Sequence, residues 1–468
     1  MTTLIINDVT AVTIDPSRRI ITDASIVIED DTIVAIGKSE ALASKYPQAD
    51  RIIEGHGKIA LPGLIDAHAH SPQAMLRGVA DDLPWRPYLE DYIWPLQGSY
   101  DADDADISLQ LCILEMITTG TTCYVDPLVH SRYDFDRQAA TIERMGIRAV
   151  MAKSVMDQTA LAQQVGVIDE GMLETEEKSL AEAAVAIDKW HGAANGRIQV
   201  WYGPRVPREP ATACSPEFYT KVAALAQEKG VGITVHLAGE KEDLPFFRRE
   251  YDALPVEFIE RVGMVGPNVL LAMCCWVSEE EIEILKRTDT KVAHCPSANM
   301  KMASGVAKVR EMRAAGVTVG LGCDSGANNN CYDMIREMKA ASLLQNIHTM
   351  DAEALTAEDV LEMATIEGAK AVGQADTLGS LEVGKKADVI LVNPRQPHAV
   401  PNFDIISNLV YTGQGTDVET VIIDGQIVMQ DRQLLTGDRE AILTEAEERG
   451  QNLLERTGIR VASSWPIE

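Results

Sequence analysis

The stretch Leu61-Pro-Gly-Leu-Ile-Asp-Ala-His-Ala-His70 decides how this chain of 468 residues is interpreted. An apolar run ends there in two histidines that are two positions apart. Side chains alternate between the two faces of a β-strand, so His68 and His70 are expected to point to the same side. Two imidazoles that converge at a strand end can hold a transition metal, because histidine is the commonest protein ligand of such ions. The stretch therefore predicts a metal anchor at the end of a strand.

Strand-like and helical segments alternate through the middle of the chain. Strands are predicted at 59–65, 121–125, 148–154, 197–202, 232–236, 269–274, 291–294 and 318–322. Helices are predicted at 106–118, 180–190, 217–228, 278–286 and 308–315. A run of eight β-then-α units is typical of a closed barrel, in which catalytic groups lie at the carboxyl ends of the strands. We therefore predict an α/β fold built on a (β/α)₈ TIM-like barrel.

The two ends of the chain predict a second, smaller domain. Short strands fill the first 58 residues, and the pattern returns near the end around Asp424-Gly425, which is a strong hairpin signal. We expect residues 1–58 and 376–439 to form one composite β-sandwich domain. Residues 59–375 would then form the metal-dependent barrel, and residues 440–468 a C-terminal helix and tail.

Composition restricts the partners and the location. The chain has 71 acidic and 42 basic residues, a formal net charge of −29, so it should repel nucleic acid and anionic membranes. No apolar run reaches the length of a membrane span, and the first residues lack the pattern of a signal peptide. The eight cysteines show no zinc-finger spacing and fit free thiols in a reducing compartment. We expect a cytoplasmic protein with a small-molecule substrate.

Later strand ends supply partners for the histidine pair. His236 ends the fifth predicted strand, and Asp324 follows the eighth. Together with His68 and His70 they fit a catalytic zinc-type site, in which Asp324 could also accept a proton. A metal ion there would lower the pKa of a bound water from about 15.7 towards about 7. One divalent ion is expected, with Zn²⁺ as the default and Fe²⁺, Co²⁺ or Mn²⁺ as ions that fit similar ligands.

Six motifs are spread along the chain: LPGLIDAHAH (61–70), LRGVADDLP (76–84), TVH (234–236), VAHCPSAN (292–299), GCDSG (322–326) and LGSLEVGKKAD (378–388). With these motifs the chain resembles the amidohydrolase superfamily over nearly its full length. It is most similar to the branch of triazine hydrolases, adenosylhomocysteine deaminases and guanine deaminases. The resemblance implies that His68, His70, His236 and Asp324 bind one metal ion. It also implies a split β-sandwich and a homo-oligomer, either a dimer or a tetramer.

Three positions depart from the pattern that this resemblance implies. Deaminases of the branch carry His-x-x-Glu after the fifth strand, whereas Gly239 takes the glutamate position here and Glu240 follows it. Met273 replaces the histidine that ends the sixth strand, and Arg205 replaces the histidine of a Gly-Pro-His sequence after the fourth. In such deaminases the glutamate shuttles protons to the ring nitrogen and the leaving amine, and the sixth-strand histidine orients the attacking water.

These departures favour attack on a carbonyl group over deamination of a ring. An aromatic amidine carbon becomes a good electrophile when a placed acid protonates the ring. An amide, urea or carbamate carbonyl mainly needs a nucleophile and a donor to the developing oxyanion, and Arg205 or His294 could be that donor. The pattern is similar to phenylurea hydrolases and molinate (thiocarbamate) hydrolase. We therefore expect hydrolysis of a non-peptide C–N bond in a small apolar amide, urea or carbamate, such as a xenobiotic.

Two other functions stay open on the sequence alone. Deamination or dechlorination of a triazine, purine or pterin would require Glu240 to replace the missing acid. A non-catalytic relative is the third interpretation, and the complete set of four ligands argues against it. The secondary residues also have plainer interpretations: Arg205 could form an ordinary salt bridge, His294 could be a core histidine, and Glu240 could face solvent.

Aromatic residues follow the first metal-ligand motif. They could line a hydrophobic substrate pocket, or pack the loop against its own barrel or a partner subunit. These residues are Trp85, Tyr88, Tyr92 and Trp94. No role is assigned to the histidines that lie away from the predicted strand ends, namely His56, His130, His191, His348 and His398.

Overall fold

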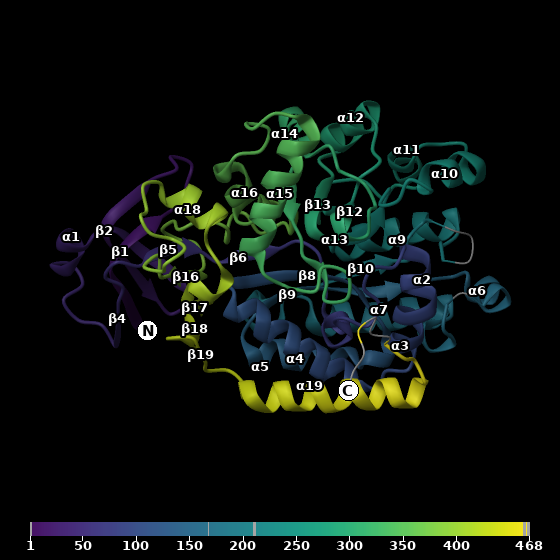
Figure 1. Ribbon diagram of the computed structural model, residues 1–468, viewed down its shortest axis with the longest axis horizontal. Helices are drawn as coiled ribbons and strands as arrows, with labels where there is room; N and C mark the ends of the chain where they lie inside the picture. Colours follow the sequence, from purple (N-terminus) through teal and green to yellow (C-terminus); the bar gives the residue numbers. More distant parts are fainter. Residues whose placement is uncertain (1, 167, 209–211, 462–464, 466–468) are drawn as a thin grey trace.

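The computed structural model describes residues 2–166, 168–208, 212–461 and 465. In Figure 1 the purple N-terminal strands lie beside the yellow-green C-terminal strands at one end of the molecule, and the barrel occupies the rest. Eight parallel strands form the barrel sheet, in the order β14-β13-β12-β11-β10-β9-β8-β6. The predicted α/β barrel with a small domain from both termini is therefore confirmed.

The barrel strands lie close to their predicted positions. They are β6 (Leu64–Asp66), β8 (Thr121–Val129), β9 (Arg148–Val155), β10 (Ile198–Pro204), β11 (Ile233–Leu237), β12 (Val269–Met273), β13 (Lys291–His294) and β14 (Val319–Leu321). Their side chains are almost all buried, as expected of parallel strands that are covered by helices. Near-continuous apolar runs, in place of strict alternation, are the sequence signature of this burial.

Helices follow the strands and cover the outside of the barrel. The larger ones are α4 (Ala102–Thr118), α5 (Phe135–Met145), α7 (Glu176–Trp190), α9 (Pro216–Lys229), α12 (Glu279–Thr288), α14 (Val309–Ala315) and α15 (Met334–Thr349). Their starts are defined by polar capping side chains: Ser278, for example, accepts the N–H of Glu281 at the beginning of α12. The sequence predictions for five of these helices are confirmed.

Shorter helical segments connect these units. They are α1 (Ser39–Ala43), η1 (Ser71–Leu76), α2 (Trp85–Pro87), η2 (Tyr88–Ile93), α3 (Trp94–Gly98), η3 (Ser131–Tyr133), α6 (Thr159–Val165), η4 (Glu170–Met172), α8 (Ala193–Gly196), α10 (Asp243–Tyr251), α11 (Pro255–Arg261), α13 (Pro296–Lys301), α16 (Ala357–Met363), α17 (Ile366–Ala371), α18 (Ile405–Tyr411) and η5 (Gly415–Asp417). The final helix, α19 (Arg439–Thr457), packs along α4, where Arg449 and Arg456 pair with the buried Asp104. Figure 1 shows α19 lying along the lower edge of the barrel.

The barrel closes through its first and last strands in two places. The N–H of Ala67 donates to the carbonyl oxygen of Leu321 at 2.8 Å. Just beyond, β7 (Ala69–His70) and β15 (Asp324–Ser325) pair in parallel, with Asp324 opposite Ala69. The closing seam therefore carries two of the predicted metal-ligand segments.

The predicted strand 59–65 is two strands that belong to different sheets. β5 (Ile59–Pro62) pairs with the terminal strands, and only β6 joins the barrel. Pro62 has no N–H to continue a ladder. At Gly63 the backbone passes so close to Thr122 that an added Cβ would lie 2.1 Å from its hydroxyl oxygen. The proline and glycine therefore allow the chain to change sheets where the sequence pattern looks continuous.

The terminal domain is one continuous sheet of nine strands. Its strands are β1 (Thr3–Val12), β2 (Ile20–Glu29), β3 (Thr32–Lys38), β4 (Arg51–Glu54), β5, β16 (Val389–Val392), β17 (Val418–Ile423), β18 (Gln426–Gln430) and β19 (Gln433–Leu434). Ile6 and Ile26 from the N-terminal strands share a buried cluster with Leu391 and Ile422 from the C-terminal strands. Contacts between the two ends thus create the hydrophobic core of this domain.

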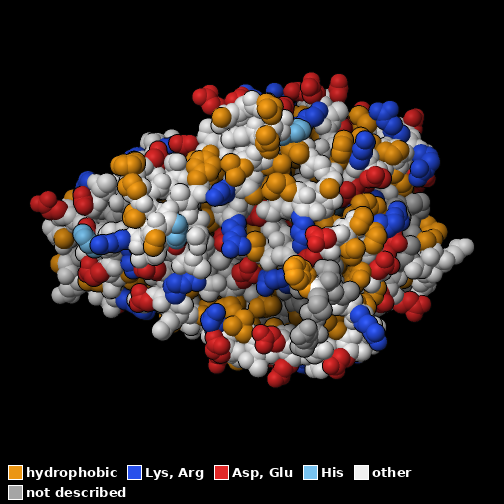
Figure 2. Space-filling view, in the orientation of Figure 1, with side chains coloured by type: hydrophobic (Ala, Val, Ile, Leu, Met, Phe, Trp, Pro, Cys, Tyr) orange, Lys and Arg blue, Asp and Glu red, His pale blue; other side chains and the backbone are white. Residues whose placement is uncertain are grey.

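The face shown in Figure 2 carries charges of both signs together with apolar side chains. Figure 2 shows basic and acidic side chains interspersed over one face of the molecule. Among the described residues, no helix combines the length and apolar character that crossing a membrane requires. All eight cysteines are free thiols, and Cys331 is the only one that is partly exposed.

A buried ion cluster joins the barrel to the terminal domain. Arg148, at the start of β9, binds Asp388 through Nε at 2.7 Å and through Nη2 at 2.9 Å. Its Nη2 also donates to Asp424 in the β17–β18 turn at 2.8 Å. All three side chains are buried. Asp424 also lies 3.5 Å from Lys386 and 3.8 Å from Arg197, so Asp388 is the carboxylate that depends most on Arg148.

Replacement of Arg148 by methionine is expected to destabilise the protein. The buried Asp388 would lose its cationic partner and Asp424 one of three, which costs about 3–5 kcal/mol of the free energy of unfolding. Urea denaturation followed by circular dichroism measures this change. Arg144→Met, at an exposed position of α5, is the matched control. Equal stability of the two variants would contradict the importance of the cluster.

Candidate metal-dependent active site

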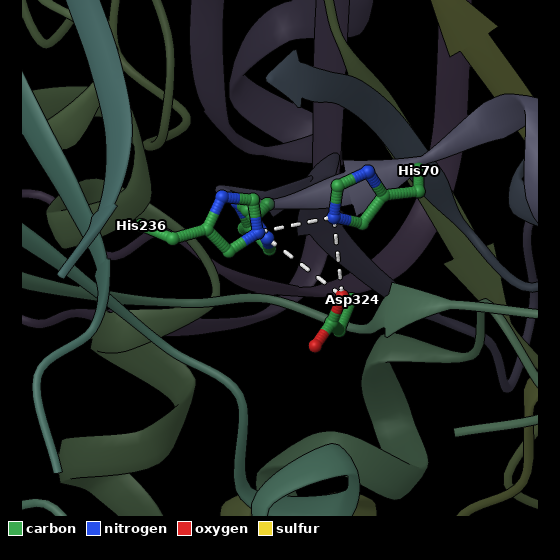
Figure 3. Close-up of side chains that lie close together, drawn as sticks. His70, His236 and Asp324 are labelled. Carbon is green, nitrogen blue, oxygen red and sulfur yellow. Dashed lines mark hydrogen bonds and ion pairs between the residues drawn. The ribbon is translucent and has the colours of Figure 1, made fainter. Parts of the chain in front are cut away.

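The four predicted ligands converge at the carboxyl end of the barrel strands. Their ligand atoms all lie within 4.8 Å of one another. Figure 3 shows the rings of His70 and His236 pointing towards each other beside the carboxylate of Asp324. Nε2 of His70 lies 3.2 Å from Nε2 of His236 and 3.4 Å from Oδ1 of Asp324. Nε2 of His68 lies 3.7 Å from the same carboxylate oxygen.

This spacing fits a zinc-type ion. Ligands about 2.1 Å from a tetrahedral ion are separated from one another by about 3.4 Å. In the part of the chain that the structure describes, neither ring nitrogen of the buried His68 has a hydrogen-bond partner. Such an arrangement costs free energy unless the nitrogens bind an ion. The donor set therefore suits one divalent cation.

Burial sets the protonation state of these ligands. It lowers the pKa of His70 to about 4 and holds the pKa values of His68 and His236 well below the ordinary range. The imidazoles are therefore neutral at pH 7 and can offer lone pairs. Burial also raises the pKa of Asp324 to about 7, and a cation among the imidazoles would favour its ionised form.

Three residues orient the ligands and were not singled out from the sequence. Oδ1 of the buried Asp66 accepts the backbone N–H of His68 and of Cys323, both at 3.1 Å, and so ties the two closing strands together. Asn328 donates from Nδ2 to Asp324 at 3.0 Å, and Tyr332 donates its hydroxyl to the carbonyl of His70 at 2.7 Å. Asp66 stands two positions before His68, so strand alternation could have found it; the other two come from a loop.

Several residues at the strand ends have left-handed backbone conformations. The φ angles are 65° at Asp324 and 79° at Met273, in a region that favours glycine. Such conformations cost about 1–3 kcal/mol each and persist where the surrounding structure holds them. The N–H of Asp324 donates to the carbonyl of His68 at 2.8 Å, which fixes the carboxylate over the histidines.

A cavity opens over the ligand cluster, with about 1010 Å³ of space that includes open solvent at its mouth. His70, His236 and Asp324 form part of its wall. Three of the four aromatic residues that the sequence proposed for a substrate pocket also line it, namely Trp85, Tyr88 and Trp94, whereas Tyr92 is not among the lining residues. We refer to this space below as the substrate cavity.

Glu240 lies in the wall of the substrate cavity, although one position later than the family pattern places a glutamate. It is half-buried and accepts a hydrogen bond from the hydroxyl of Ser304 at 2.6 Å. Burial raises its pKa above the ordinary value. A Cβ at Gly239 would lie 3.0 Å from Nη2 of Arg208 and 3.5 Å from Cβ of Met273. Gly239 and Glu240 both line the cavity, and Glu240 supplies the carboxylate there.

The two predicted oxyanion donors occupy different surroundings. Arg205 is 5% exposed, lines the cavity and lies 5.9 Å from the ring of Trp94. His294 ends β13 and is fully buried, outside the four-ligand cluster and outside the cavity lining. His130, which the sequence analysis left without a role, lines the cavity. It was missed because β8 continues to Val129, beyond the predicted end of that strand.

Comparison with known proteins finds a family match over most of the chain and several relatives that are deaminases. The Amidohydrolase family matches residues 59–428, and the bacterial Imidazolonepropionase-like composite domain matches residues 26–49. A 5-methylthioadenosine/S-adenosylhomocysteine deaminase from Pelotomaculum thermopropionicum is 37% identical over 97% of this chain and 100% of its own length. A 5′-deoxyadenosine deaminase from Methanosarcina acetivorans is 38% identical over 97% and 99%. A zinc-bound adenosine deaminase structure from Xanthomonas campestris has a TM-score of 0.90 and 26% identity, covering 97% and 99% of the two chains.

Loss of the side chain that holds Asp324 is expected to weaken zinc binding. Asn328 also accepts the N–H of Ser325 at 3.0 Å, so Asn328→Ala frees both the ligand and its loop. Substitutions of residues that orient ligands cost about 10–100-fold in metal affinity. Competition with a chromogenic chelator measures this affinity. Asn452→Ala, at an exposed position of α19, is the control and should bind zinc like the wild type.

Proposed function

This chain belongs to the amidohydrolase family, and we propose that it is a zinc-dependent deaminase of an adenosine-type amino-heterocycle. As a family member it is a hydrolase that acts on C–N bonds other than peptide bonds. The observation that carries the finer proposal is a carboxylic acid, Glu240, in the wall of the same cavity as the metal ligands. Deaminase relatives that align over 97% of the chain support it. Carbonyl hydrolysis, which the sequence alone favoured, therefore becomes the second candidate.

Two acidic side chains, Asp324 and Glu240, carry out the proton transfers of this reaction. A bound divalent ion supplies Lewis acidity and lowers the pKa of a water that it binds. Asp324 takes the proton of the water that attacks the amino-bearing carbon. Glu240, whose raised pKa favours the acid form, protonates the ring nitrogen and makes that carbon electrophilic. Asp324 then passes this proton to the amino group, which leaves as ammonia. The remaining proton of the water returns to Glu240, and the heterocycle keeps the oxygen of the water and the proton on its ring nitrogen.

Asn299 is a candidate for orienting the heterocycle. It lines the substrate cavity and is 1% exposed, and within the described residues neither Oδ1 nor Nδ2 has a hydrogen-bond partner. A side-chain amide offers one acceptor and two donors, which match an exocyclic amino group and a neighbouring ring nitrogen. We propose that Asn299 pairs with this edge of the substrate.

The second candidate function is hydrolysis of an amide, urea or (thio)carbamate. The observation in its favour is that Gly239 and Met273 line the cavity and carry no proton-handling side chain. In that reaction Arg205, which lines the cavity, would stabilise the oxyanion, whereas His294 lies outside the lining. Deamination and carbonyl hydrolysis differ in their need for Glu240, and this difference makes them separable by experiment.

Other features expected from the sequence remain proposals of the same kind. We propose a barrel domain of residues 59–375, a composite domain of residues 1–58 and 376–439, and a cytoplasmic homo-oligomer. Apolar side chains lie along α15 in Figure 2, and Leu343, Ile347 and Met350 are exposed at helical spacing. Such a stripe supports a contact between subunits.

Replacement of Glu240 by glutamine is expected to abolish deamination. Loss of a placed general acid costs about 10²–10⁴-fold in rate, and glutamine keeps the shape of the side chain. The measurement is ammonia release from 5′-deoxyadenosine, 5-methylthioadenosine and S-adenosylhomocysteine by zinc-loaded protein. Glu242→Gln, at an exposed position of the same loop, is the matched control. Zinc content should be equal in all three proteins.

Two outcomes would reject the deaminase proposal. One is full deaminase activity of Glu240→Gln. The other is a lack of ammonia release from every amino-heterocycle while aryl ureas, anilides or thiocarbamates are cleaved. The second outcome would establish carbonyl hydrolysis, and Glu240→Gln should then retain most of that activity.

Replacement of Asn299 by leucine is expected to lower activity without lowering stability. The buried amide has no partner, so an apolar side chain of similar volume should keep or raise the free energy of unfolding, by up to about 1–3 kcal/mol. The kcat/KM for the amino-heterocycle should fall by at least about tenfold. Urea denaturation and steady-state kinetics measure the two effects. Lower stability with unchanged kcat/KM would contradict the proposed role.

A further inference from the structure

Two arginines line the substrate cavity, and they differ in whether a carboxylate compensates their charge. Nε of Arg208 lies 2.8 Å from Oδ1 of the buried Asp243, so its charge is compensated. The guanidinium of Arg205 has no ion pair and no hydrogen bond with any residue that the structure describes, although Arg205 is among the buried residues. An isolated buried cation is costly, and arginine cannot lose its proton to avoid the cost.

The groups around Arg205 do not supply the missing negative charge. Burial raises the pKa of Cys214 to about 12 and that of Tyr133 well above its usual range, so both are neutral at pH 7. Glu174, a carboxylate that also acts on Arg205, is bound by the buried Lys153, whose Nζ lies 2.9 Å from its Oε2. Among the described residues, no ionised carboxylate is therefore left over to pair with Arg205.

A second polar side chain on the same part of the cavity wall also lacks a partner. Nδ1 of the buried His130 has no hydrogen bond within the described residues. Burial, followed by the nearby charge of Arg205, lowers the pKa of His130 to about 3, so its ring is neutral. A neutral imidazole can donate one hydrogen bond to an anion. The wall thus offers a guanidinium with no ion pair or hydrogen bond among the described residues, and an imidazole whose Nδ1 has no hydrogen bond there.

We propose that Arg205, with His130, binds a carboxylate carried by the substrate, in the same cavity that the metal ligands line. The guanidinium fork matches a carboxylate, which can accept two parallel hydrogen bonds from it. One uncompensated positive charge suits a monoanion better than a phosphate dianion. Arg205 is then a specificity-determining residue, in place of the oxyanion donor that the sequence suggested.

The subsite also limits the substrate class. Trp94, Leu89 and Met172 line the cavity as well, so the body between the reacting group and the anion is apolar or aromatic. Resting on the proposed function, the substrate is an amino-heterocycle whose substituent ends in a carboxylate. The anion subsite itself depends only on Arg205 and its surroundings, so it can be tested without turnover.

The test measures binding of simple probes to the zinc-loaded protein by calorimetry at pH 7. The probes are 3-phenylpropionate, its neutral amide 3-phenylpropanamide, and phenyl phosphate. We expect the carboxylate to bind about 10–100-fold more tightly than the amide, because a hydrogen bond to a charged group contributes that much. Arg205→Met should remove this preference, and Arg205→Lys should retain part of it.

Stability distinguishes an anion subsite from a structural role. Because the cation has no ion pair or hydrogen bond among the described residues, Arg205→Met should unfold at a temperature no lower than the wild type, with the same zinc content. A clear loss of thermal stability would assign Arg205 to the fold and overturn the proposal. A carboxylate preference that survives in Arg205→Met would place the probe on the metal and would also overturn it.

The remaining outcomes separate this proposal from the proposed function. Tighter binding of phenyl phosphate than of the carboxylate would reject a carboxylate as the occupant. A carboxylate preference that depends on Arg205, in a protein without deaminase activity, would support the subsite and reject deamination. Deaminase activity with no carboxylate preference would support deamination and reject the carboxylate subsite.

Discussion

The pairing that closes the barrel is the constraint on which the site depends. β7 and β15 are each two residues long, and they bring His70 and Asp324 together from opposite ends of the barrel sequence. Asp66 strengthens the same seam by accepting N–H groups from both sides. Closure of the fold and assembly of the ligand cluster are therefore one event. Residues more than 250 positions apart become neighbours without the help of a flexible loop.

This coupling explains why the fold and the metal cluster could be predicted from sequence. Parallel strands are buried on both faces, so they appear as apolar runs, and their carboxyl ends meet at one rim. A histidine or aspartate that directly follows such a run must lie on that rim. The rule located His68, His70, His236 and Asp324, which the structure brings within 4.8 Å of one another.

Other features depend on contacts that no local pattern records. The split of the predicted strand 59–65 follows from the close approach of Gly63 to Thr122, two residues that are far apart in sequence. The extension of β8 to Val129 placed His130 in the cavity, although Pro127 within the strand favoured an earlier end. The position of Glu240 depends on the hydroxyl of Ser304, which comes from another unit of the barrel. Local propensity contains no information about such partners.

Net charge is an equally poor guide to the chemistry of the cavity. The chain carries a formal charge of −29, and acidic and basic side chains are mixed on the face that Figure 2 shows. Within the cavity the outcome depends on individual pairs: Asp243 neutralises Arg208, and Lys153 neutralises Glu174. The charge of Arg205 is left over. An acidic protein can therefore still bind an anion in its cavity. A buried charge acts through a low dielectric, whereas the many surface charges are screened by water and salt.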